Sequence, residues 1–476
     1  MNRRNYTLHL ALAGALVLLA AAAGRIERWD GPRVRVDVKR EVSVVPAAPA
    51  VDPPLVVGEG EEPDDAEVLV RFKPGVSEER MEEIAASLND RIEDEIESVE
   101  GLTAIDDLDD REAARVAEEY AALPEVEYAE PNFRIEAEPT GVGNTFGQGG
   151  SFAESLPAGG PNDPLLAEQW GLLNTGQRNG RAEADISAFA AWDKTQGSKK
   201  VVIAVLDSGV DYTHPDLAGN MWHRPDDMEM YVDKQLGVMD DSEGFSAVES
   251  ERDPMDENGH GTHCAGIVGA EGDNNLGITG VNWHVEIMPL KFMGRGGFGS
   301  TKDAIEAINY VIARKKDGVN VRVISASWGS TSRSKALEDV IRKAGEADIL
   351  FVAAAGNDGA DADRRPHYPS GYKLPNVLSV AALDRRDELA SFSNYGAKGV
   401  HVAAPGKEIL STWLGGGYEE HSGTSMATPF VAGVAGLVLS VEPNLSVKEL
   451  RDRLMNTVDK LDSLKGKVVS GGRVNA

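Results

Sequence analysis

The sequence contains a single cysteine, Cys264, among 476 residues. One thiol cannot form an internal disulfide, which excludes a small disulfide-stapled scaffold. Basic residues are also scarce, because 48 Lys and Arg stand against 78 Asp and Glu and the net charge is −30. This balance argues against nucleic-acid binding and against a polybasic membrane-binding surface. Since 41% of the residues are apolar and 26% charged, the chain can bury a sizeable core, and global disorder is excluded.

The first 60 residues carry the pattern of a targeting segment and a linker. Arg3 and Arg4 precede an uncharged stretch rich in Leu and Ala that ends in small residues. This pattern predicts a secretory signal peptide in residues 1–24 and an exported protein, since the apolar run is short for a membrane span. An uncleaved signal anchor is the alternative, and only that alternative would make the membrane a partner. Residues 25–60 are expected to be a linker.

A small α+β domain is predicted for residues 61–138 from alternating strand-like and helix-like periods. The expected elements are strands at 67–72, 102–105 and 126–131 and helices at 78–88 and 111–123. Residues 52–138 hold 29 acidic and seven basic residues, for which a solvated surface is the simplest explanation. Residues 139–160, rich in Gly, Ser and Pro, predict a flexible linker that contains a maturation site.

Residues 161–476 alternate between apolar strands and amphipathic helices. Strands are expected at 201–206, 286–292, 321–327, 349–355, 376–382 and 400–404, and helices at about 262–269, 301–316, 334–347, 425–441 and 446–457. Uniformly apolar strands separated by helices predict an α/β fold with a mostly parallel sheet covered by helices on both faces. Ligands bind at the carboxyl ends of the strands in such folds, so the chemistry is expected there.

Three polar residues stand at informative places in this pattern. Asp207 follows an apolar strand, which puts a carboxylate at the active edge of the sheet, although alone it could be a turn cap. His260 stands at the mouth of a helix, and His263 three residues on raises the alternative of metal binding; helical zinc proteases, however, place a Glu between their two histidines. Ser425 opens a helix, with Pro429 expected in or near the first turn. Its hydroxyl lies in the helix N-terminal field, although alone it could be an N-cap.

The segments around these residues, in this order, resemble the three catalytic blocks of the subtilisin-like serine proteases, or subtilases. The blocks are Val205-Leu-Asp-Ser-Gly-Val-Asp211, Gly259-His-Gly-Thr-His-Cys-Ala-Gly266 and Gly423-Thr-Ser-Met-Ala-Thr-Pro429. A fourth segment, Ala353-Ala-Ala-Gly-Asn-Asp-Gly359, resembles the one that supplies the oxyanion-hole asparagine. The resemblance covers residues 161–476, and the order Asp, His, Ser is that of subtilisin.

The resemblance implies a role for each of these side chains. Ser425 is expected to attack the acyl carbon, while His260 takes its proton and later returns it to the leaving amine. Asp207 would fix the imidazole tautomer. Asn357 and the backbone N–H of Ser425 would stabilise the tetrahedral oxyanion. Cys264, behind His260 on the same helix, is expected to have a packing role.

A substrate groove is also implied by the resemblance. Ser327, Trp328 and Gly329 match the strand end that borders the primary side-chain pocket. The segment 294–299 matches the strand that pairs with extended peptide, and its glycines, including Gly297 and Gly299, leave backbone groups open for pairing. A glycine-rich turn without this role is the alternative.

A structural calcium site is implied by the likeness of Pro161-Asn-Asp-Pro164 to the start of thermitase-like subtilases. Side-chain ligands would come from Asp163, Asp216 and Asn274. The carbonyl oxygens of Glu271, Leu276 and Ile278 would complete an oxygen cage of the kind that calcium prefers. A capped loop without metal is the alternative, and no organic cofactor is expected.

These features together predict an exported serine endopeptidase that acts on protein or peptide substrates through an acyl-enzyme intermediate. The segments Val68-Leu-Val-Arg-Phe-Lys-Pro-Gly75 and Glu127-Tyr-Ala-Glu-Pro-Asn-Phe133 resemble the inhibitory propeptide of subtilases, so the protein is expected to inhibit and process its own precursor. Two rivals stay open at this stage: a catalytically inert protein that uses the groove to hold peptide, and a processing protease restricted to defined sites.

Overall fold

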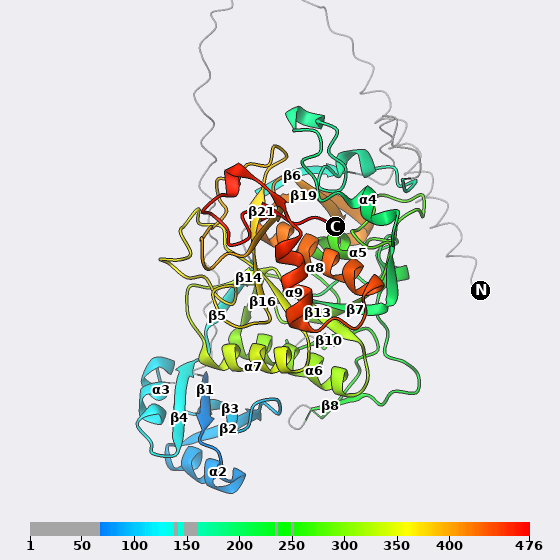
Figure 1. Cartoon of the computed structure of the whole chain (residues 1–476). Helices are drawn as coiled ribbons and strands as arrows, with labels where there is room; N and C mark the ends of the chain where they lie inside the picture. The colour runs from blue at the N-terminus through cyan, green and yellow to red at the C-terminus, as the bar shows by residue number, and fades with distance from the viewer. Residues whose placement is uncertain (1–66, 110, 138–140, 147–159, 234–236, 249–251) are drawn as a thin grey trace, which may run out of the picture. The chain divides into compact units, whose positions relative to one another are not determined.

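The computed structural model describes residues 67–109, 111–137, 141–146, 160–233, 237–248 and 252–476 (Figure 1). These residues belong to one compact unit, residues 60–476. The predicted signal segment and the linker at 25–60 lie outside the described residues, as do 138–140 and 147–159 of the predicted maturation region.

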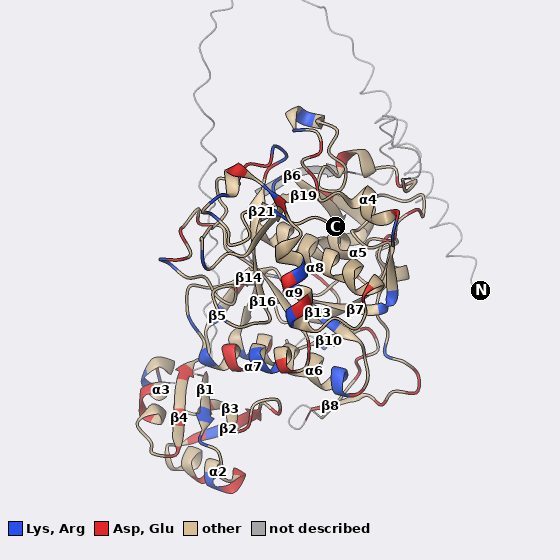
Figure 2. Cartoon of the chain, in the orientation of Figure 1, with Lys and Arg blue, Asp and Glu red and all other residues tan. Residues whose placement is uncertain are grey.

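The N-terminal domain, residues 67–131, is a four-stranded antiparallel sheet with two helices. Its elements are β1 (Glu67–Phe72), α2 (Glu78–Ser87), β2 (Asp90–Glu95), β3 (Leu102–Asp107), α3 (Ala113–Ala121) and β4 (Val126–Pro131), and the strand order is β2-β3-β1-β4. Val68, Val70 and Phe72 pack against the two helices, whereas Leu69 on the opposite face of β1 joins a core shared with the C-terminal domain. Red segments recur on α2, α3 and β4 in Figure 2, as the acidic composition predicts.

The C-terminal domain is built on a nine-stranded sheet. In spatial order its strands are β10 (Phe245–Ser246), β11 (His284–Lys291), β7 (Gly197–Asp207), β13 (Val321–Ala326), β15 (Leu350–Ala354), β16 (Val377–Leu383), β17 (Val402–Pro405), β21 (Gly472–Arg473) and β20 (Asp459–Lys460). All neighbouring pairs are parallel except the last. The predicted mostly parallel sheet is therefore confirmed.

Helices cover both faces of this sheet. They are α4 (Ala188–Trp192), α5 (His260–Gly269), α6 (Thr301–Lys316), α7 (Lys335–Glu346), α8 (Thr424–Val441) and α9 (Val447–Asn456). Alternate residues of β7 separate the two layers: Ile203 and Val205 share a core with α5 and α8, whereas Ala204 and Leu206 share one with α6 and α7. The α8 helix is long and apolar enough to cross a membrane, but 83% of it is buried, as in the core helix of a soluble protein.

Three small sheets complete the fold among the described residues. They are β12-β5-β14 (Phe298–Ser300, Arg134–Ala137 and Trp328–Gly329), β18-β19-β6 (Ile409–Trp413, Gly417–Ser422 and Gly141–Phe146) and β8-β9 (Tyr231–Asp233 and Gly237–Met239). Residues 139–160 were expected to be a flexible linker, but 141–146 form strand β6 because β19 offers an edge with which to pair.

Candidate active site

Asp207 and His260 meet where β7 ends and α5 begins. The Nδ1 atom of His260 lies 2.7 Å from Oδ1 of Asp207, and the two residues are 4% and 0% exposed. The backbone N–H of Ser208 donates to the same carboxylate oxygen at 2.8 Å. A carboxylate at Nδ1 holds the proton of a neutral imidazole on that nitrogen, which directs the lone pair to Nε2.

Two residues that the sequence analysis did not identify as functional bind the N-terminus of α5. Its N-cap residue, Gly259, has no side chain that could accept the free N–H groups. Asp256 accepts the backbone N–H of Gly259 at 2.9 Å and that of Thr262 at 2.9 Å. The hydroxyl of Ser208 accepts the N–H of Gly261 at 3.0 Å and donates to Asp256. Asp256 and Ser208 together replace a local N-cap and fix the end of the helix from which His260 projects. In the sequence, the only indication of Asp256 was an acidic residue shortly before the histidine motif.

Ser425 is the second residue of α8, and Pro429 is the sixth. The prediction that Pro429 lies in or near the first turn was wrong, because the proline stands where its missing N–H would have bonded to the carbonyl of Ser425. That carbonyl instead accepts the hydroxyl of Ser327 at 2.8 Å and the thiol of Cys264 at 3.6 Å. In the other direction, the Ser425 hydroxyl donates to the carbonyl of Ser327 at 3.1 Å.

Cys264 connects the two halves of the site. Its sulfur lies within 4.8 Å of side-chain atoms of Asp207 and His260, as well as contacting Ser425. Burial raises the pKa of the Cys264 thiol well above its ordinary value, so the residue packs as a neutral thiol. His263, the other residue of the metal-binding alternative, is directed elsewhere: its Nε2 lies 3.1 Å from the carbonyl of Ile409 and 3.0 Å from that of Glu419.

Asn357 faces the start of α8. Its Oδ1 accepts the backbone N–H of Thr424 at 2.9 Å and the Thr424 hydroxyl at 3.1 Å, which directs the NH2 group toward Gly423. A Cβ added to Gly423 would lie 3.4 Å from Nδ2 of Asn357 and 3.5 Å from the backbone N of Ser425. The bare glycine therefore leaves open the space that both N–H donors border.

Four of the five predicted groove residues lie along strand β5. β5 runs antiparallel between β12 and β14, with Gly299 opposite Ile135, Gly329 opposite Glu136 and Trp328 opposite Ala137. The N–H of Ala137 donates to the carbonyl of Gly297 at 2.8 Å. The fifth residue, Ser327, precedes Trp328 and binds Ser425. Beyond the undescribed residues 138–140, Gly141 of β6 pairs with Ser422, three residues before Ser425. The described chain thus flanks Ser425 on both sides.

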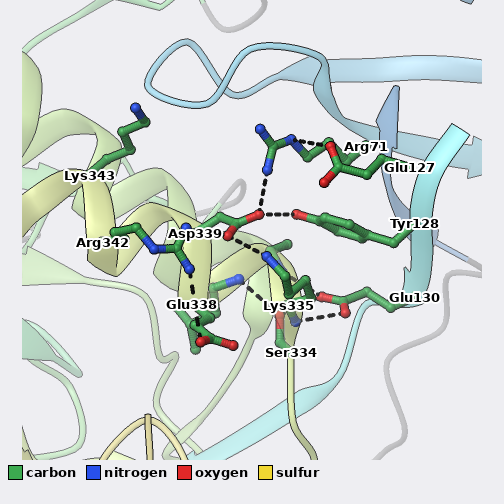
Figure 3. A network of polar contacts seen from close by, with 12 residues as sticks. Arg71, Glu127, Tyr128, Glu130, Ser334, Lys335, Glu338, Asp339, Arg342 and Lys343 are labelled. Carbon is green, nitrogen blue, oxygen red and sulfur yellow. Dashed lines mark hydrogen bonds and ion pairs between the residues drawn. The ribbon is translucent and has the colours of Figure 1, made fainter. Parts of the chain in front are cut away.

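The N-terminal domain and the segment that leads to β5 also bind the N-termini of α6 and α7. The carboxylate of Glu130 accepts the backbone N–H groups of Lys335 and Ala336 at 2.8 and 3.0 Å, and the carbonyl of Phe133 accepts the N–H of Thr301 at 2.9 Å. In Figure 3, Arg71 and Tyr128 converge on Asp339 of α7, at 2.7 and 2.9 Å. A carboxylate placed over exposed N–H groups is favoured by the helix dipole as well as by the hydrogen bonds.

The residues predicted to bind calcium gather around two buried carboxylates. Asp163 and Asp216 are both 0% exposed. Asp216 accepts the amide of Asn274 at 2.7 Å and the N–H of Ile278 at 2.9 Å. Burial, together with the charge of Asp216, raises the pKa of Asp163 to about 7. Leu276 is 42% exposed, so only its backbone is available to a ligand. Two buried carboxylates supply the hard oxygen ligands that calcium prefers, and in this respect the residues fit that ion. The oxygen of Asn274 accepts the N–H of Leu276 at 2.8 Å, so its amide would have to turn to add a side-chain ligand.

Comparison with known proteins gives two family matches. Residues 198–471 match the model of the Subtilase family, and residues 59–132 match that of the Fervidolysin N-terminal prodomain. The chain is 34% identical to a thermophilic serine proteinase of Bacillus sp. (strain AK1) over 421 residues, 86% of each chain. It is 37% identical to thermitase of Thermoactinomyces vulgaris over 66% of this chain and 97% of the relative. It is also 36% identical to a cell wall-associated protease of Bacillus subtilis, over 63% of this chain and 30% of the relative.

Proposed function

Because this chain belongs to the subtilase family and is a subtilisin-like serine protease with an N-terminal prodomain, we propose that Ser425, His260 and Asp207 are its catalytic triad. The observation that carries the proposal is the 2.7 Å contact between His260 and Asp207 beside the helix that bears Ser425. Peptide hydrolysis requires the Ser425 hydroxyl to turn from the carbonyl of Ser327 to Nε2 of His260, which then accepts its proton as the acyl carbon is attacked.

The space in front of Gly423 would receive the oxyanion of the tetrahedral intermediate. Asn357 and the backbone N–H of Ser425 border that space and are the donors. After the amine leaves with the proton from His260, a water molecule activated by the same imidazole hydrolyses the acyl-enzyme. Asp207 stabilises the imidazolium that forms in both steps.

The prodomain would act as an intramolecular inhibitor whose last strand fills the groove. β5 pairs with β12 and β14 as an extended substrate would, and main-chain pairing of this kind accepts many sequences. Since Ala137 and Gly141 flank Ser425, we place the maturation cut between these two residues. We further propose that residues 1–24, which lie outside the described residues, direct export as a signal peptide, with an uncleaved signal anchor as the alternative.

Calcium would tie the N-terminal arm of the protease to its core. Asp163, Asp216 and Asn274 would supply side-chain oxygens, with carbonyl oxygens from Glu271, Leu276 and Ile278. The bound ion supplies positive charge for two carboxylates that burial otherwise forces toward their protonated form. The role is structural, because the cluster contributes no residue to the site around Ser425.

Labelling with an active-site phosphonate, followed by mass spectrometry, tests the assignment. The label should appear on Ser425, and the mature N-terminus should fall between residues 138 and 141. Ser425→Ala should lower kcat by about 10⁶, as in subtilisin, and the precursor should accumulate. Ser440→Ala on the same helix is the matched control and should keep full activity. A label on another residue, or normal maturation of the alanine variant, would show that the nucleophile lies elsewhere.

A further inference from the structure

Three carboxylates from three separate elements converge at the interface of the prodomain and the protease. They are Asp94 of β2 in the prodomain, Asp233 of β8 and Glu306 of α6 in the protease. One oxygen from each lies within 4.8 Å of the other two. The residues are 4%, 1% and 4% exposed, so water does not screen the carboxylates from one another.

Among the described residues, one further carboxylate and one cation act on this cluster. Glu97, on the segment after β2, adds negative charge beside Glu306, whereas Tyr231 of β8 is a neutral phenol, and the described cation that acts on Asp94 is Lys302 of α6. Lys302 is already engaged by Glu67 and Glu93, at 3.0 and 2.8 Å. Burial raises the pKa of Asp94 and that of Glu306.

Glu306 is the carboxylate of this cluster whose environment indicates a bound ligand. It is 96% buried, and its Oε1 has no hydrogen-bond partner among the described residues. A buried carboxylate oxygen without a donor is strongly destabilised unless a proton or a cation meets it. The same three-carboxylate geometry suits a metal ion, because oxygens at 2.3–2.6 Å from a central calcium lie up to about 5 Å apart.

We propose that Asp94, Asp233 and Glu306 bind a divalent cation of the calcium class that bridges the prodomain and the protease. The donor set is all oxygen and fully anionic, with no nitrogen or sulfur ligand, which favours a hard cation over zinc or copper. The site is separate from the cluster of Asp163 and Asp216, since it shares no residue with it.

This site exists only while the prodomain is docked. Asp94 leaves with the prodomain after maturation, so the mature protease keeps two of the three ligands. By linkage, a cation that binds the docked state better than the separated parts must hold the prodomain in place, and the docked prodomain must tighten cation binding by the same factor. The proposal rests on the proposed role of the prodomain as inhibitor, and it adds the external calcium concentration as a control of its release.

The first test counts calcium ions in the intact precursor, with Ser425→Ala as the background so that the chain stays whole. After removal of metal, calcium is titrated calorimetrically and the stoichiometry is compared with that of Glu306→Gln at the same pH. We expect the variant to lose one calcium ion per chain. Glu127→Gln, which changes an exposed prodomain carboxylate paired with Arg71, is the matched control and should lose none. Asp216→Asn should lose a different ion, so the double variant with Glu306→Gln should lose two.

Asp94→Asn in the otherwise wild-type chain provides a second variant if Glu306→Gln fails to fold. Millimolar calcium should slow the appearance of activity after maturation at least tenfold in the parent, and this dependence should vanish in the variant, whose mature protease is unchanged. An equal calcium count in parent and both variants would overturn the proposal and leave protons, or a cation outside the described residues, as the source of neutralisation. The calcium stoichiometry is measured without enzymatic activity, so it tests this proposal independently of the triad assignment.

Discussion

Ser327 and Ser425 are joined by two reciprocal hydrogen bonds, since each hydroxyl donates to the backbone carbonyl of the other residue, at 2.8 and 3.1 Å. The first bond satisfies the carbonyl that Pro429 leaves without an intrahelical partner. The second holds the proposed nucleophile in a resting position. Ser327 directly precedes β14, which pairs with β5 at the proposed groove. The same residue therefore couples the groove strand to the start of α8.

Ser327→Ala should destabilise the protease by about 1–3 kcal/mol, because it leaves the buried carbonyl of Ser425 with only the weak thiol donor of Cys264. Thermal unfolding in the Ser425→Ala background measures this without autolysis. Ser325→Ala on the preceding strand is the matched control: the hydroxyl of Ser325 is buried without a partner among the described residues, so its removal should be neutral or stabilising. Equal effects of the two substitutions would contradict the compensating role of Ser327.

Asn357→Leu should lower kcat by about 10²–10³ with little change in KM, as at the corresponding donor of subtilisin, since an oxyanion donor acts mainly on the transition state. Gly423→Ala should have a similar effect for a different reason, because its methyl group fills the space that the donors border. Steady-state kinetics on a peptide substrate separates the two parameters. A large rise in KM with unchanged kcat would make Asn357 a ground-state binding residue instead.

The sequence motifs were sufficient to identify the proposed site residues that lie around Ser425 in the structure. Local periodicity also predicted the parallel sheet, because its strands are apolar on both faces. It missed β2, whose sequence Asp-Arg-Ile-Glu-Asp-Glu has almost no apolar residue. Four of these six residues are acidic, and Asp94 among them is buried against the protease rather than against the core of its own domain. No periodicity within a segment can show a partner that lies far away in the chain.

The same limit applies to the cap of α5 and to strand β5. Asp256 substitutes for a side chain that Gly259 lacks, but acidic residues are frequent throughout this chain, so one that stands shortly before a motif does not by itself indicate a cap. β5 pairs with β12 and β14, which lie much later in the chain. Main-chain pairing places little demand on side chains, so the sequence of β5 carries no clear mark of its partners.

Asp216→Asn should abolish the stabilisation of the mature fold by calcium. The ion binds the folded state only, and at about 100 times its dissociation constant it contributes about 2.7 kcal/mol. Melting is measured in the Ser425→Ala, Glu306→Gln chain, which lacks the proposed bridging site, as the parent. Its melting in millimolar calcium and in chelator should differ by several degrees, and the two curves should coincide once Asp216→Asn is added. Asp273→Asn in the same loop should retain the response, because the Asp273 carboxylate accepts the exposed N–H of Asn162 and is not among the proposed ligands. Identical melting curves for the parent in both buffers would defeat the calcium proposal.

His401 should make stability fall with decreasing pH. Burial and the nearby Arg451 lower its pKa to about 3, and its Nδ1 accepts the N–H of Ser379 at 2.9 Å. In the unfolded chain this histidine binds a proton near pH 6.5, whereas in the folded chain it stays neutral down to much lower pH. The free energy of unfolding therefore decreases by up to about 1.4 kcal/mol per pH unit below pH 6.5. His401→Asn keeps an acceptor in place of Nδ1 and should flatten this slope between about pH 6.5 and 4. If both proteins show the same urea midpoints across that range, His401 is not responsible.

The prodomain, residues 61–138 added as a separate chain, should inhibit the mature protease, because it has its own apolar core and brings β5 and Glu130 to matching sites. Glu130→Ala removes a charged acceptor from two backbone N–H groups of α7 and should weaken inhibition about 10- to 100-fold. Glu127→Ala removes an exposed carboxylate that pairs with Arg71 within the prodomain, and it should change inhibition less than about threefold. Added salt should weaken inhibition if the acidic surface assists encounter, since exposed charges are screened beyond about 8–10 Å. A passive solubility segment would instead leave activity unchanged at micromolar concentration, and a chain lacking residues 61–138 would then mature normally.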